Sequence, residues 1–219
     1  MFDALKRLIG PSTASGHEGE TLAAWAKVDG LVFKRVKDKS AGGGYVVESS
    51  RGWRVEWGAS QRVYIHGPEL RFRCDTGIPS DVQCILLTKV LAQTLESDVF
   101  NRYTNAMQTQ IDHTLPDEMR WLAMHPRVSL AVAPVLAKRF ALFTNAEPLT
   151  QRWLGAEVVQ WLEEAAQTWW TDALVLVLTV NRGMLTLRMS GRPLESSQLH
   201  LVGALFERVA LRLKEVGHG

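Results

Sequence analysis

The chain has 219 residues, 46% of them hydrophobic and 22% charged, and its 25 basic and 23 acidic side chains give a formal net charge of +2. These proportions exclude a disordered or fibrous protein, and so balanced a charge gives no long-range attraction for a nucleic acid. A domain of this length buries enough surface to fold without a disulfide or a structural metal, so we expect no cofactor.

Residues 1–40 are predicted to form an N-terminal arm. The apolar side chains of residues 2–9 share one face of a short amphipathic helix, which we interpret as docking on its own domain or on a partner rather than anchoring to a membrane. Residues 11–19 are interpreted as a tether. The basic segment 33–39 suits a solvated edge strand or loop, and contact with phosphate or anionic lipid is the alternative.

The chain contains no signal of secretion or membrane insertion. Its N-terminus lacks an uninterrupted apolar stretch followed by a cleavage site, and no run approaches the ~18 apolar residues that a spanning helix needs. We therefore expect a soluble cytoplasmic protein. Cys74 and Cys84 alternate with apolar neighbours, which predicts two buried free thiols.

Residues 45–75 predict an antiparallel meander in which alternate side chains face a core. Tryptophan, valine, leucine, phenylalanine and cysteine occupy the inward positions of its two clearest strands. The opposite, solvated face would carry Arg54, Arg71 and Arg73. We regard these three arginines as candidates for binding an anion.

A helix is predicted to begin at Ser80, a good N-cap, and to run through Phe100. A cavity for a small ligand could lie between this helix and the meander. Further helices are expected over residues 116–125, 128–141 and 148–167. Pro116 and Pro148 suit the first turns of two of them, whereas Pro134 must interrupt or begin the helix over residues 128–141.

The densest group of titratable side chains lies between Asp112 and His125. Asp112 beside His113 could orient a general base. Neighbouring residues on a helix do not face each other, however, so a solvated helix end is the preferred interpretation. The six histidines are otherwise scattered, without the spacing of a zinc site.

The last third of the chain predicts the core. Residues 173–180 suit a strand buried on both faces, and residues 184–189 alternate so that Thr186 and Arg188 should face solvent. A helix is expected next, over residues 195–216. The stretches 70–80 and 185–193 both reach Gly-x-Pro before a predicted helix, which is compatible with a duplicated strand-strand-helix unit, with halves 41–112 and 140–219. Ordinary turn chemistry is the alternative.

The eight tryptophans are more than a domain of this size requires. Tryptophan is enriched at interfaces and in ligand pockets. Trp169 and Trp170 lie between the long predicted helix and the first central strand, where we expect their rings to diverge and one ring to stay partly exposed. Both are therefore candidates for contact with a partner or ligand.

We predict an α+β fold in which an antiparallel meander and hairpin pack against amphipathic helices within a single domain over residues 41–219. No motif specific for catalysis occurs in the sequence. The preferred function is a non-catalytic module for protein interaction or self-association, with a protein partner or a homodimer. The alternatives are a protein that binds a small or lipid-like ligand and, less favoured, an enzyme that uses the region from Asp112 to His125.

Overall fold

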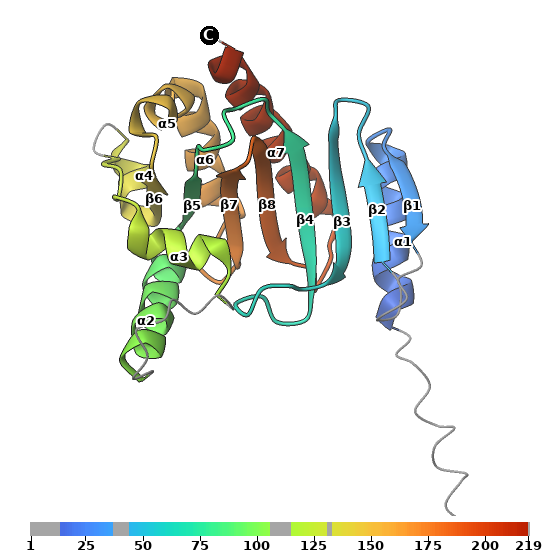
Figure 1. The fold of residues 1–219 in the computed structure, drawn as a ribbon. Helices are drawn as coiled ribbons and strands as arrows, with labels where there is room; N and C mark the ends of the chain where they lie inside the picture. Colours follow the sequence, from blue (N-terminus) through green and yellow to red (C-terminus); the bar gives the residue numbers. More distant parts are fainter. Residues whose placement is uncertain (1–13, 37–43, 106–114, 131–132, 219) are drawn as a thin grey trace, which may run out of the picture.

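An eight-stranded antiparallel sheet with helices on both faces organises the computed structural model, which describes residues 14–36, 44–105, 115–130 and 133–218 (Figure 1). The sheet order is β1-β2-β3-β4-β8-β7-β5-β6. The strands are β1 (Val32–Val36), β2 (Gly44–Glu48), β3 (Trp53–Ala59), β4 (Pro68–Asp75), β5 (Cys84–Thr88), β6 (Phe140–Thr144), β7 (Leu176–Asn181) and β8 (Met184–Ser190). The α+β architecture predicted from the sequence is confirmed.

The helices divide between the two faces of the sheet (Figure 1). They are α1 (Ala14–Val28), α2 (Lys89–Asn105), α3 (Asp117–Met124), α4 (Pro134–Arg139), α5 (Glu147–Trp153), α6 (Ala156–Thr168) and α7 (Ser196–His218). Helices α1, α5 and α6 pack around α7 on one face. Helices α2 and α3 pack on the opposite face, against β5 and β6. Among the described helices, none combines the length and apolarity needed to cross a bilayer.

An aromatic cluster forms the centre of the larger core, between the sheet and α1 and α7. The rings of Trp25 and Trp53 have centroids 6.4 Å apart, and those of Phe72 and Phe206 are 5.4 Å apart. Gly203 of α7 permits this packing, because a Cβ at that position would lie 3.1 Å from the ring of Trp25. The helix predicted over residues 195–216 is confirmed as α7.

A smaller core lies on the opposite face, where α2 and α3 cover part of the sheet. Ile85, Leu87 and Val177 project into it from β5 and β7. Strand β7 is thus buried on both faces over Leu176–Val180, as its apolar run predicts. The β7–β8 turn has positive φ at Arg182 and Gly183, 51° and 74°, which suits a two-residue hairpin turn.

Two of the predicted helices run into strands. The helix predicted from Ser80 is wrong over residues 84–88, which form β5, and the helix predicted over residues 128–141 is found only at Pro134–Arg139, after which residues 140–144 form β6. Both are short, wholly buried apolar runs, and periodicity cannot separate such a strand from a buried helical segment. The cavity expected beside a helix at Ser80 therefore lacks that wall. The two Gly-x-Pro motifs also lead into different elements, since the first precedes β5 and the second precedes α7.

The N-terminal region contributes directly to the packed body. Helix α1 begins at Ala14, so the tether expected over residues 11–19 is helical from that point. Leu22 and Trp25 are buried in the larger core, and β1 is the exposed edge strand that the basic segment predicted. The amphipathic segment at residues 2–9 lies outside the described residues. Cys74 and Cys84 are buried free thiols, as predicted.

Candidate functional site

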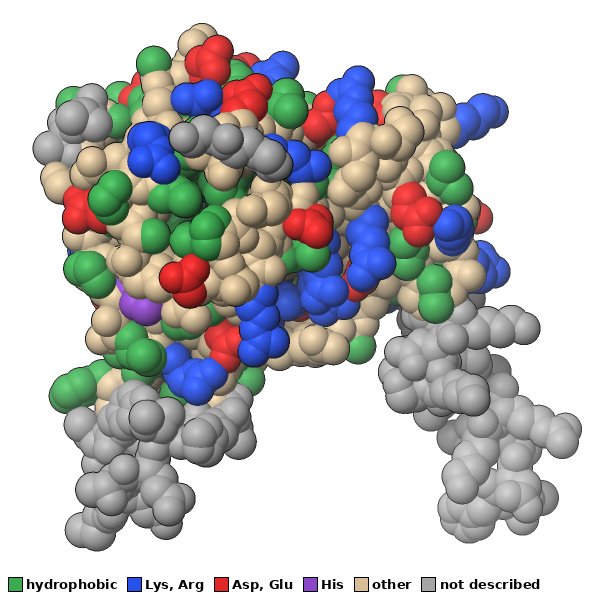
Figure 2. Space-filling model, turned by 45° about the horizontal axis from the view of Figure 1, so that its top comes forward, with side chains coloured by type: hydrophobic (Ala, Val, Ile, Leu, Met, Phe, Trp, Pro, Cys, Tyr) green, Lys and Arg blue, Asp and Glu red, His purple; other side chains and the backbone are tan. Residues whose placement is uncertain are grey.

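Four arginines gather on the half of the sheet that α2 and α3 leave open, and we call Arg54, Arg71, Arg73 and Arg188 the arginine face. The β3–β4 register places Arg54 opposite Arg73, and the β4–β8 register places Arg71 opposite Arg188. Alternate residues of a strand share one face, so the four guanidinium groups project together. Figure 2 shows Lys and Arg side chains grouped across the middle of this surface, with acidic side chains among them.

Glu56 of β3 neutralises part of this charge. Arg71 Nε donates to Glu56 Oε2 at 2.9 Å, and Arg54 Nη2 lies 2.9 Å from Glu56 Oε1. Burial alone would raise the pKa of Glu56. The hydrogen bonds from Arg71 and the positive charges of Arg71, Arg73 and Arg54 outweigh that effect and lower the pKa. Glu56 is therefore held as a carboxylate that serves two of the four arginines.

Glu69 of β4 forms an ion pair with a third arginine of this face, Arg188. Arg188 Nη1 donates to Glu69 Oε1 at 2.5 Å, and Ser60 Oγ donates to Glu69 Oε2 at 2.9 Å. The prediction that Arg188 faces solvent is wrong, because this pair is buried on the sheet beside Tyr64. Thr186 is buried as well. Burial lowers the pKa of Arg188, an effect that the charge of Glu69 opposes.

Arg73 has no carboxylate as an ion-pair partner in the described part of the chain. Its guanidinium forms no hydrogen bond or ion pair with any residue in the described part of the chain, and its Nε is shielded from solvent. Burial lowers the pKa of Arg73, and the positive charges of Arg71, Arg188 and Arg54 add to this effect against the opposing charge of Glu56. A half-buried cation surrounded by other cations gains strongly from an anionic ligand.

A buried carboxylate fixes the border of the arginine face. Glu118 of α3 accepts a hydrogen bond from Tyr64 Oη at 2.6 Å and pairs with Arg62. Burial, and then the charge of Glu118, raise the pKa of Tyr64 well above its ordinary value. This contact ties the loop between β3 and β4 to α3. Glu118 belongs to the titratable region noted in the sequence, but its contact with Tyr64 and Arg62 could not be predicted, because it depends on how α3 lies over the sheet.

The titratable region around His125 is only partly described. Asp112 and His113 lie outside the described residues, so their proposed role in orienting a base stays a prediction. His125 Nε2 lies 2.8 Å from Gln83 Oε1, and burial lowers the pKa of His125. Among the described residues, no group of three histidine, cysteine or acidic side chains is arranged to hold a metal ion.

The two adjacent tryptophans have different surroundings. Their rings do not diverge as expected but stack, with centroids 6.1 Å apart and planes 15° apart. Trp170 is completely buried and packs against Phe140, whereas Trp169 is half-buried and lines a surface cavity. Only Trp169 of this pair can therefore contact a ligand or partner in this conformation.

A second polar cluster joins α1 to α7 around a cavity of about 520 Å³. Asp29 accepts a hydrogen bond from Trp25 Nε1 and lies 2.8 Å from His200 Nδ1, while Glu207 accepts from Trp53 Nε1 at 3.0 Å. These acids are already engaged within the protein. They fix α1 and the β2–β3 turn to α7, and we assign them a structural role.

Comparisons with known proteins identify no family for this chain. No family model and no curated protein matches it. One solved structure, the mycobacterial trehalose monomycolate transport factor A (TtfA), aligns over 91% of this chain and 93% of its own, with 10% identity and a TM-score of 0.49. A likeness at this level carries no argument about function.

Proposed function

We propose that the protein is a non-catalytic interaction module whose arginine face binds an acidic segment of a partner protein. The observation that carries this proposal is Arg73, a half-buried guanidinium without an anionic partner in the described part of the chain. A carboxylate placed between Arg54 and Arg73 would accept charge-assisted hydrogen bonds from two planar forks at once. It would also relieve the repulsion between these two opposed cations.

The mixture of charges on the arginine face favours a protein over a polyphosphate. Glu56 stands among the accessible arginines, so a uniformly negative polymer would meet a carboxylate as well as Arg54, Arg71 and Arg73. A protein segment can place acidic groups opposite these arginines and a neutral or donor group opposite Glu56. Such matching of opposite charges supplies specificity across an interface.

The same charge pattern disfavours self-association through this face. In a two-fold symmetric dimer the patch meets its own copy, so the excess cation Arg73 would face more arginine. We therefore favour a different protein as the partner over the homodimer. The face is also open, and none of the cavities described for this structure is lined by Arg54, Arg71 or Arg73, which favours a macromolecular partner over a small anion.

The test is a titration of the ¹⁵N-labelled full-length protein with an acetylated hexaglutamate peptide. We expect the arginine Nε–Hε resonances of Arg73 and Arg54 to shift in a saturable way, and the binding to weaken when ionic strength rises from about 0.05 M to about 0.5 M. An uncharged Gly-Ser peptide of the same length is the control ligand. Arg73→Ala should weaken hexaglutamate binding about tenfold, the value of one charge-assisted hydrogen bond.

Two further variants make the titration specific. Arg73→Lys keeps the charge but loses the planar fork, so its affinity should lie between those of wild type and Arg73→Ala. Arg152→Ala removes an exposed arginine from α5, which packs against α7 on the other side of the sheet, and should leave binding unchanged. Equal losses in Arg73→Ala and Arg152→Ala would contradict the proposal. Saturable binding of inorganic pyrophosphate at Arg73 without binding of the peptide would replace the protein partner by a small anion.

A further inference from the structure

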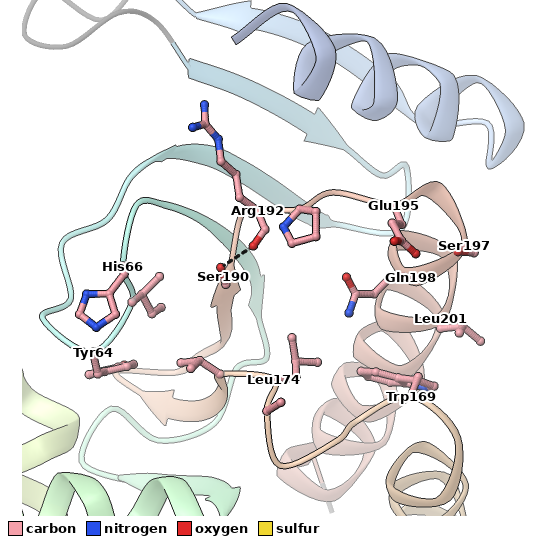
Figure 3. A pocket seen from close by; sticks show the side chains of 14 residues that line it. Tyr64, His66, Trp169, Leu174, Ser190, Arg192, Glu195, Ser197, Gln198 and Leu201 are labelled. Atoms are coloured by element: carbon pink, nitrogen blue, oxygen red, sulfur yellow. Dashed lines mark hydrogen bonds between the residues drawn. The ribbon is translucent and has the colours of Figure 1, made fainter. Parts of the chain in front are cut away.

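A cavity of about 480 Å³ opens at the end of the sheet away from the β7–β8 turn, between the β3–β4 loop, the α6–β7 connection and the start of α7. Its size falls within the range of small-molecule sites in proteins. Figure 3 shows its main walls: Trp169 and Leu174 before β7, Tyr64 and His66 on the β3–β4 loop, and Leu201 on α7. Leu201 is 47% exposed although it lies beside the half-buried ring of Trp169.

The side chain of Gln198 is directed into this cavity and has no partner among the described residues. The amide of Gln198 points from α7 toward the middle of the space (Figure 3). It makes no hydrogen bond to any residue in the described part of the chain. An amide carries both donors and an acceptor, so it can bind a carbonyl, a hydroxyl or an N–H group of a ligand.

The charged side chains of the cavity do not offer a free charge at its centre. The guanidinium of Arg192 turns away from the cavity toward α1 (Figure 3), where its Nε lies 2.6 Å from Glu18 Oε1. Ser190 Oγ donates to the carbonyl of Arg192 at 3.0 Å. Glu195 lies exposed at the rim. An anionic ligand would therefore lose its hydration in this cavity without gaining a free lysine or arginine partner.

We propose that this cavity binds an uncharged amphipathic small molecule, with its planar or branched apolar part against Trp169, Leu174 and Leu201 and one polar group on Gln198. The site is separate from the arginine face and does not depend on the function proposed for that face. An apolar body beside one convergent polar group is the usual composition of a small-ligand site.

The probe for this site is N-phenyl-1-naphthylamine, an uncharged fluorophore with two aromatic parts and one N–H donor. We expect saturable one-to-one binding to the full-length protein, with energy transfer from tryptophan to the probe. The anionic analogue 1-anilinonaphthalene-8-sulfonate should bind at least about tenfold more weakly, because its sulfonate finds no free lysine or arginine in the cavity. Equal or tighter binding of the sulfonate would overturn the assignment to an uncharged ligand.

Two exposed leucines on the same helix give a matched pair of variants. Leu201→Glu places a carboxylate against the cavity and should weaken probe binding about tenfold or more, since the burial of one leucine side chain contributes about that factor. Leu211→Glu makes the same change at a position that is 59% exposed and does not line the cavity, and it should leave binding unchanged. Gln198→Ala should weaken binding severalfold. Equal effects of Leu201→Glu and Leu211→Glu, or no effect of either, would overturn the site.

Discussion

Arg54 and Arg73 are direct cross-strand partners in the β3–β4 pair, so two guanidinium groups project from opposed positions on the same face of the sheet. Like charges in such positions are destabilising. Glu56 relieves Arg54 through an ion pair, whereas Arg73 has no such partner among the described residues. The fold thus carries a local electrostatic cost at the position that we assign to partner binding.

Replacing Arg73 with methionine should therefore stabilise the protein while it weakens peptide binding about tenfold, as Arg73→Ala does. We expect a gain of about 0.5 kcal/mol in the free energy of unfolding, because the repulsion across the strand pair disappears. Urea unfolding followed by tryptophan fluorescence measures this change.

Arg71→Met, two residues along the same strand, is the matched comparison. It should lose about 1–3 kcal/mol, since it removes the donor to the half-buried Glu56. A stability loss in Arg73→Met as large as that in Arg71→Met would contradict this view.

Breaking the buried pair between Glu69 and Arg188 should be among the most destabilising changes on this face. Glu69→Leu leaves the guanidinium of Arg188 buried without its carboxylate, and we expect a cost of about 3–5 kcal/mol. The double variant Glu69→Leu with Arg188→Leu removes both charges and should recover most of that loss. Urea unfolding of the two single variants and the double variant gives the coupling between the residues. A double variant as unstable as the sum of the single variants would show that the pair does not act as a unit.

The alternation of the sequence was sufficient to predict which side chains of β3 and β4 share the open face. A strand has a period of two, so the apolar positions at Leu70 and Phe72 determine that Arg71 and Arg73 point the other way. Three members of the arginine face could be found in this manner without any structure. The strands β7 and β8 could be predicted from their apolar run and their alternation, and α7 from the three- and four-residue spacing of its apolar residues.

The pairing of Glu69 with Arg188 on this face could not be predicted. Arg188 and Glu69 meet because β8 lies beside β4 in the sheet, although 119 positions separate them in the chain. Alternation assigns a residue to a face but does not give the order of strands. Gln198 was likewise overlooked, because a single glutamine on an amphipathic helix resembles any polar surface position until the α6–β7 connection is placed beside it.

The thiol of Cys84 should be unreactive in the folded protein. Burial raises its pKa to about 12, and the hydrogen bond with Thr150 opposes this only in part. The thiolate is the nucleophile toward disulfide reagents, so at pH 8 both its protonation and its burial prevent reaction. The variant Cys74→Ala isolates this thiol. We expect no release of thionitrobenzoate from Ellman's reagent by the folded variant, and release equivalent to one thiol after unfolding in guanidinium chloride. Rapid reaction of the folded variant would contradict the packing of β5 between the two cores.

Glu56 should make the stability of the protein depend on pH in the acidic range. The net effect of its surroundings is a lower pKa in the folded protein than the ordinary value of 4.5, which we take for the unfolded chain. The folded state therefore binds this proton less readily. Its stabilising contribution is fully present above pH 4.5 and is lost as the pH falls through the folded pKa. Unfolding free energies measured from pH 7 down to about pH 3 should fall more steeply for the wild type than for Glu56→Gln, which cannot titrate at this position.

Other carboxylates titrate in the same range, so the difference between the two curves is the informative quantity. Glu48→Gln, which removes a more exposed carboxylate from neighbouring β2, is the control for the loss of one negative charge. Parallel curves for wild type and Glu56→Gln would mean that the arginine face does not hold Glu56 in its ionised form.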